Sequence, residues 1–300
     1  MKSTLNLVGW RPEGPTKRVC WKCAANTLDL PFTDPSLTAA WRRTCISDRG
    51  YIIGSSITGT EVSSLFAVPG FRLSFVSIDW MHVVDLGIAQ HCFGNVQWER
   101  FQELGGVACR PAQTVGCLLT MIRTASRQVG MSTPPVNALT LSMFKVDSKP
   151  PKLKTKAAET RKLVSVLRFV LQHFFPRSSD HDVMRFNCVE LLARAYSEME
   201  LWSSESRTRI GQLGRQHVTL YAELAREQLS RAAGEWVMWR LYPKHHLFAH
   251  LLESQICTYD SPQASWCYAD EGEIGKCVAI AEAVHVKTLN KALLEKYRLW

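Results

Sequence analysis

The chain has 300 residues, of which 46% are hydrophobic and 21% charged, a balance typical of a globular protein with a sizeable core. No apolar run of about 18 residues predicts a membrane span, and the segment from Met1 to Trp10 lacks the apolar stretch of a signal peptide. We therefore expect a protein of the nucleus or cytoplasm that is neither secreted nor bound in a membrane. The net charge of +9 favours an anionic partner such as nucleic acid, although an inert basic surface explains the charge equally well.

The first half of the chain predicts three successive regions. Residues 1–70 are rich in Gly, Pro, Ser and Thr and predict an irregular segment around a Cys-x-x-Cys motif. Residues 71–144 predict a helical region, with one helix after Asp79 and a second from about residue 112 to 129. The stretch from Lys145 to Lys156 holds two prolines and five lysines, which predict a basic, extended linker between two regions.

Residues 157–300 predict a helical domain. Apolar positions from Leu163 to Phe174 recur at helical spacing, and Pro176 ends that helix. The next helix is expected to begin near Ser179 or Asp180, because either side chain can accept hydrogen bonds from the first free amides. Further helices are expected around residues 210–224, 244–254, 271–284 and 287–297. Because no alternating strand pattern follows residue 145, the fold class is mainly α.

Cysteine and histidine pairs are the first candidates for chemistry. The two-residue gap between Cys20 and Cys23 lets both thiolates reach one tetrahedral zinc, for which a second pair of ligands must come from elsewhere. His250 could supply that pair together with His245 or His246, and on a continuous helix the pair four residues apart shares a face better. The alternative is that the cysteines are ordinary loop thiols and that the histidines form local hydrogen bonds.

Two further motifs contain carboxylates. Asp79 and His82 lie on one side of a first helical turn and could form a hydrogen bond, although capping alone explains an aspartate at this position. Acidic residues follow Trp266, and among them Glu271 could bind a divalent metal ion. Acids at a helix start more often complement the helix dipole, and one carboxylate holds such an ion poorly.

The order of these motifs resembles that of CACTA-like DDE transposases. The matching residues are Cys20-x-x-Cys23, Asp79-x-x-His82, His245-x4-His250 and Trp266-x-Tyr-x-x-Glu271. The arrangement is also similar to that of the V(D)J recombinase catalytic subunit, in which a Cys pair and a His pair from a helical insertion share a zinc ion. The resemblance covers most of the chain as sparse motifs.

The resemblance implies roles for individual residues. Cys20, Cys23, His245 and His250 would bind a structural Zn²⁺, with His246 as the alternative to His245, and Glu271 would be the third catalytic acid. The other two acids of the family come from an RNase H-like sheet upstream of the Cys pair. We therefore expect the helical insertion and C-terminal helices of such an enzyme with the sheet largely missing, and Mg²⁺ or Mn²⁺ chemistry only in an intact family member.

The expected function is therefore binding rather than catalysis. A catalytically incomplete fragment would keep its zinc and bind DNA weakly, in a salt-sensitive way, and a homo-oligomer is left open. The alternatives are a solvated charge run, a helical protein-interaction module without a nucleic-acid role, and a hydrolase with an unrecognised site. Seven basic residues are the candidates for contact with phosphates: Lys145, Lys149, Lys152, Lys154, Lys156, Arg161 and Lys162.

Overall fold

The computed structural model describes most of the chain. The described residues are 19–57, 62–105, 107–108, 110–145, 147, 149–231, 238–256, 261–264, 266–283, 288, 291–292 and 295, without the side chains of Ser55, Ile57, Ala264, Asp270 and Glu271. Over these residues the fold is mainly helical, as the sequence predicts, with two isolated β-bridges and no sheet. None of the described helices combines the length and the apolar character that a membrane crossing needs.

Short elements make up the N-terminal segment. Most are single turns of 3-10 helix, as expected for a stretch rich in Gly, Pro and Ser. The longest is an α-helix of ten residues. In chain order the elements are η1 (Ala40–Arg43), α1 (Asp48–Ile57), η2 (Ser64–Ala67) and η3 (Leu73–Phe75).

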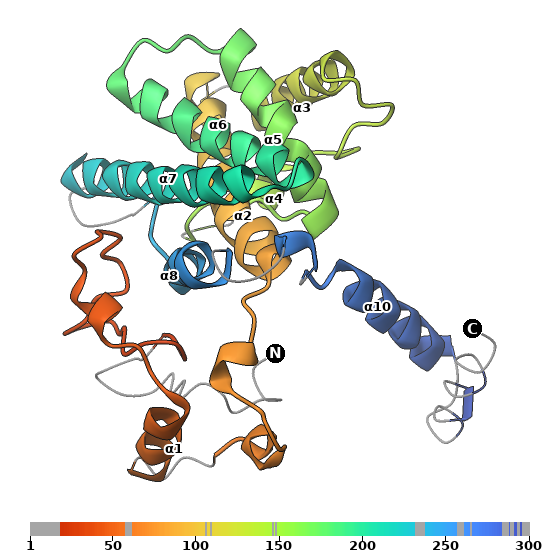
Figure 1. The fold of residues 1–300 in the computed structure, drawn as a ribbon. Helices are drawn as coiled ribbons and strands as arrows, with labels where there is room; N and C mark the ends of the chain where they lie inside the picture. Colours follow the sequence, from red (N-terminus) through yellow and green to blue (C-terminus); the bar gives the residue numbers. More distant parts are fainter. Residues whose placement is uncertain are drawn as a thin grey trace.

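A bundle of longer helices forms the body of the molecule (Figure 1). Helix α6 packs against α7, α5 and α2, α5 also packs against α3, and the apolar faces of these helices share one core with α8. Ser179 caps α6 as predicted, because its Oγ accepts a hydrogen bond from the amide of Asp182 at 3.2 Å. The helices of the body are η4 (Met81–Ala89), α2 (Gln90–Glu103), α3 (Pro111–Gln128), α4 (Leu141–Phe144), α5 (Ala157–Phe174), α6 (Asp180–Glu200), α7 (Ser204–Arg231), α8 (Pro243–His250) and η5 (Leu251–Gln255).

The C-terminal part holds η6 (Pro262–Ala264) and α10 (Tyr268–Ala283). Figure 1 shows α10 projecting away from the bundle, and Ile274 and Val278 on it are exposed. Most of the helix expected over residues 287–297 lies outside the described part of the chain.

The basic stretch is extended, as its prolines predict, but it does not separate two regions. The amide of Leu153 donates to the carbonyl of Gln90 at 2.8 Å, and the Leu153 side chain is buried in the common core. That core combines residues from both sides of the stretch, such as Phe144 and Leu167. Residues 149–156 therefore form a packed strap across α2, in which Leu153 is buried while Lys149, Lys154 and Lys156 stay exposed to solvent.

Candidate metal centre

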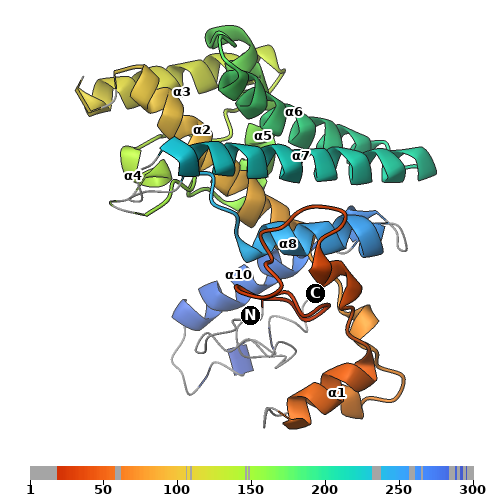
Figure 2. The same cartoon turned by 90° about the vertical axis from the view of Figure 1, so that its left-hand side faces the viewer.

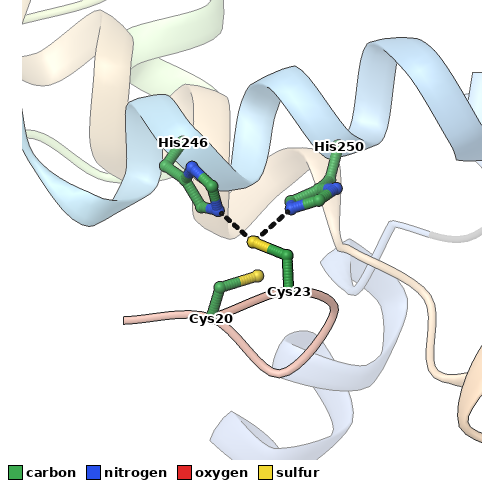
Figure 3. Close-up of side chains that lie close together, drawn as sticks. All are labelled: Cys20, Cys23, His246 and His250. Carbon is green, nitrogen blue, oxygen red and sulfur yellow. Dashed lines mark hydrogen bonds between the residues drawn. The ribbon is translucent and has the colours of Figure 1, made fainter. Parts of the chain in front are cut away.

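A tight turn in the N-terminal segment brings two cysteine sulfurs together. The amide of Val19 donates to the carbonyl of Ala25 at 3.0 Å, and the amide of Lys22 donates to the Sγ of Cys20 at 3.3 Å. An isolated antiparallel bridge joins Cys23 to Cys45 and fixes the far side of the turn. The sulfurs of Cys20 and Cys23 therefore face the same side (Figure 3).

Helix α8 supplies two imidazoles to the same point. His246 and His250 are one turn apart and lie on one face, because residues four apart are neighbours on an α-helix. The Nε2 of His246 is 3.2 Å from the Sγ of Cys23, and the Nε2 of His250 is 3.3 Å from the same sulfur. Figure 2 shows the N-terminal segment lying against α8, and Figure 3 shows all four side chains converging between them.

The centre is shielded from water. Cys20 and Cys23 are 0% exposed, His246 is 2% exposed and His250 is 7% exposed. The ring of Trp41 covers both histidines edge-on, with its centroid 4.3 Å from that of His246 and 5.2 Å from that of His250. Dry surroundings strengthen the bonds between a cation and thiolate ligands.

The pKa shifts of Cys20 and His246 favour the forms that bind a metal ion, whereas that of Cys23 favours the thiol. The hydrogen bond between the two thiols lowers the pKa of Cys20, against the opposing effect of burial, and raises the pKa of Cys23. Burial lowers the pKa of His246, so its imidazole is neutral and has a free lone pair for a ligand bond.

The four residues fit one ion. A single donor atom from each of Cys20, Cys23, His246 and His250 lies within 4.8 Å of the other three. The Nε2 of His246 faces Cys23 and is the ring atom that would bind the ion, whereas the buried Nδ1 has no hydrogen-bond partner among the described residues. The cluster could hold a metal ion.

His245, which the resemblance placed first in the set, does not join this cluster. Its Nδ1 accepts a hydrogen bond from the amide of Tyr242 at 3.0 Å, and its ring lies 4.4 Å from that of Tyr221 in the core. One residue along a helix turns a side chain by about 100°, which takes His245 away from the cysteines. The alternative, His246, is the residue that lies beside Cys23.

The Asp79 motif begins the π-helix η4. The carboxylate caps this helix through hydrogen bonds from the amides of Met81 at 3.2 Å and His82 at 3.0 Å, and it also binds the His82 ring. The glycine of the motif, Gly87, leaves room for Lys244, since a Cβ there would lie 2.4 Å from the lysine Cδ. Lys244 in turn donates to the carbonyl oxygens of His82 and Leu86 at 2.6 and 3.0 Å.

Sequence reasoning missed Asp85, which is fully buried beside this motif. It accepts hydrogen bonds from the hydroxyls of Tyr196 and Tyr268, and burial raises the pKa of Asp85 to about 7. The sequence around Asp85 could have predicted its burial. It stands two residues before a glycine in an otherwise apolar run, and an aspartate buried in a core needs hydrogen-bond partners.

Glu271, the expected third acid, belongs to helix α10, and its side chain lies outside the described part of the structure. Trp236 also lies outside it. Trp239 is buried and donates to the Oε1 of Glu99 at 2.7 Å, so it is a core anchor, as expected for most tryptophans of this chain.

The candidate phosphate-binding residues divide into two groups. Lys145, Lys152 and Arg161 are partly buried, and the Arg161 guanidinium lies 4.5 Å above the Trp266 ring. Burial lowers the pKa of both Lys145 and Lys152. The exposed group is Lys149, Lys154, Lys156 and Lys162.

A hollow lies beside the basic residues. Its volume is about 610 Å³, and Arg161, Lys162, Trp266 and Tyr268 are among the residues that line it. Aromatic faces next to cationic groups are the surroundings in which unpaired bases stack.

Comparison with models of protein families, with curated proteins and with solved structures finds no match to this chain.

Proposed function

We propose that the protein is a transposase-derived DNA-binding protein in which a zinc ion holds the N-terminal segment to the helical body. One observation carries the proposal: the Cys pair meets a His pair more than 220 residues later in one buried cluster. This is the arrangement that the resemblance to CACTA-like transposases implies, with His246 in place of His245.

The chemistry of the ligands favours zinc. Two thiolates and two neutral imidazoles form a typical structural zinc set, because Zn²⁺ is borderline-soft and accepts a closed tetrahedron of S and N ligands. Four protein ligands leave no position for a substrate. The ion therefore stabilises the fold and takes no part in a reaction.

The proposal of DNA binding is based on exposed positive charges. Lys149, Lys154, Lys156 and Lys162 are exposed on the strap and on α5, and such cations bind phosphates without reading base edges. Binding is accordingly weak, tolerant of sequence and sensitive to salt, and it would place the action of the protein in the nucleus. The proposal assigns no phosphoryl transfer to this chain, since two-metal catalysis needs a set of carboxylates and the resemblance matches only Glu271.

The test is the salt dependence of binding to a DNA duplex. In a triple variant with Lys154, Lys156 and Lys162 changed to Gln, we expect weaker binding and a slope of log Kd against log salt that is smaller by roughly 1 to 3. The matched control changes Arg209, Arg226 and Arg231 to Gln. It removes the same charge from residues that already pair with Glu198, Glu223 and Glu227. Equal loss in both triples, or no binding by the wild type, would refute the DNA-binding proposal.

A helical protein-interaction module is the second candidate. Ile274 and Val278 on the projecting helix α10 are 61% and 49% exposed, and apolar residues close together on one helix are typical of partner-binding faces. Absence of DNA binding together with self-association that is lost in a double variant of Ile274 and Val278 would favour this candidate.

A further inference from the structure

A second group of metal-ligand side chains lies apart from the first. Asp79 and His82 at the start of η4 meet Cys267, which directly precedes α10. The Oδ1 of Asp79 accepts a hydrogen bond from the Cys267 amide at 3.1 Å, so one carboxylate ties together segments 188 residues apart. One donor atom from each of the three residues lies within 4.8 Å of the other two.

Helix capping accounts for only part of this arrangement. The amides of Met81 and His82 use Asp79 as a cap, but a cap requires neither an imidazole nor a thiol beside the carboxylate. The Nδ1 of His82 and the Oδ2 of Asp79 are 2.5 Å apart and form a hydrogen bond. Side-chain exposure of 32% for His82 and 12% for Asp79 leaves the group within reach of ions from solvent.

We propose that Asp79, His82 and Cys267 form a second metal site, open on one side, for a divalent transition-metal ion of the zinc class. The ion takes the place of the hydrogen between Nδ1 of His82 and Oδ2 of Asp79, whose proton moves to Nε2 of the neutral imidazole, and the thiol proton of Cys267 leaves to solvent. Its ligands are Oδ2 of Asp79, Nδ1 of His82 and Sγ of Cys267. The carboxylate and the thiolate together balance the charge of the ion.

The ligand types select the metal. A thiolate and an imidazole favour Zn²⁺ or Co²⁺, whereas Mg²⁺ and Ca²⁺ prefer oxygen ligands alone. The hydrogen bonds from Met81 and Cys267 to Oδ1 remain in place and hold the carboxylate in position, as is usual around metal sites.

Among the side chains that the structure describes, three can bind an ion at this site, compared with four at the centre on α8. Three protein ligands leave a fourth position for water or for an anionic oxygen, which is the pattern of zinc sites that meet a substrate. The site shares no residue with the Cys20 cluster and is independent of the proposed structural zinc.

Metal stoichiometry measured on the full chain tests the site. After loading with Zn²⁺ and desalting, we expect about two ions per chain in the wild type and about one in His82→Ala and in Cys267→Ser. His250→Ala should lose the other ion, and the double variant His82→Ala/His250→Ala should lose both. With Co²⁺ as the probe, Cys267→Ser should reduce the sulfur-to-cobalt charge-transfer absorption. His173→Ala and Cys117→Ser are matched controls at exposed positions and should change neither count.

The outcomes separate the two sites. A wild-type chain with one ion that is lost in His250→Ala but kept in His82→Ala and Cys267→Ser overturns the second site and leaves the structural zinc standing. One ion that is lost in His82→Ala and Cys267→Ser but kept in His250→Ala supports the second site and rejects the first. No bound ion in any form overturns both.

Discussion

At the scale of single residues, a position where two backbone segments pack closely requires glycine. A Cβ built at Gly94 on α2 would lie 2.5 Å from both the Cα and the amide nitrogen of Lys152, and neither of these backbone atoms can rotate away. Gly94 is thus the position that lets the strap lie directly on α2.

Gly94→Ala should lower the free energy of unfolding by about 3 kcal/mol, because the strap must move away from the core. Gly116→Ala on α3 is the matched control, since nothing lies within 4 Å of its added Cβ, and it should raise stability by roughly 0.5 to 1 kcal/mol. Urea denaturation measures both. Similar effects of the two changes would show that the strap does not rest on α2 in this way.

A buried ion network joins α2, α6 and α7. His181 lies between Glu99, whose two carboxylate oxygens are 3.2 Å from Nε2, and Glu227, 2.7 Å from Nδ1. Both ring nitrogens donate, so the imidazole is charged, and chiefly the hydrogen bond to Glu99 raises the pKa of His181 to about 9.

The stability that His181 adds should depend on pH. A raised pKa means that the contribution is complete below the unfolded pKa of about 6.5 and is lost as pH rises through 9. The difference in unfolding free energy between the wild type and His181→Gln should therefore shrink over this range. A difference for His181→Gln that stays constant from pH 6 to 9 would contradict a charged His181.

At the scale of elements, the π-helix η4 depends on a distant side chain. Lys244 donates to two of its carbonyl oxygens, and Gly87 provides the space for the lysine stem. Carbonyl groups left without partners at such a wide turn are costly when buried.

Lys244→Met should lower stability by about 1 to 3 kcal/mol, because it removes two part-buried hydrogen bonds to η4 while keeping the apolar stem. Hydrogen exchange should accelerate over Met81–Ala89, and the exposed control Lys154→Met should leave it unchanged. Unchanged exchange in Lys244→Met would mean that η4 does not need the lysine.

Helix periodicity predicted much of the fold, because most helices bury one apolar face. The helix expected at residues 112–129 is α3, and the caps and ends of α5 and α6 fall near the expected residues. The π-helical turn and the packing of the strap were not predictable, since both depend on contacts with residues far along the chain, Lys244 and Gly94. A local sequence pattern does not show which residues far along the chain will contact it.

At the scale of the whole molecule, the N-terminal segment has little apolar attachment to the body. Its own small cluster contains Val19, Ala39 and Trp41 and reaches α8 through Ala249, apart from the main core. The four-ligand centre is a further link between the segment and the bundle, beside the ion pair of Arg42 with Glu253 and the packing of Trp21 on the main core.

Removing the metal should release the segment without unfolding the body. With a strong chelator, trypsin should cut faster after Lys22, Arg42 or Arg43, while the helical circular dichroism stays nearly constant, because among the described residues the segment contributes only the partly buried Trp21 to the main core. Cys20→Ser should be cut at the fast rate with or without chelator. Cutting of the wild type at one rate in both conditions would show that no metal holds the segment.

The candidate centre was predictable in outline only. The spacing of Cys20 and Cys23 predicts the first ligand pair, and the resemblance predicts the His pair. The choice between His245 and His246 depends on which face of α8 packs against the cysteine turn, and the sequence does not show this. Cys267 was not predicted as a ligand, because a single cysteine becomes a candidate only when the fold brings it close to Asp79 and His82.

The most direct test of the account is zinc binding by two neighbouring variants, His246→Gln and His245→Gln, measured with a chelator of known affinity. We predict that His246→Gln weakens binding at the Cys20 and Cys23 centre by at least roughly 10 to 100-fold, whereas His245→Gln leaves it nearly unchanged. Equal affinity in the wild type and His246→Gln, or loss confined to His245→Gln, would contradict the centre described here.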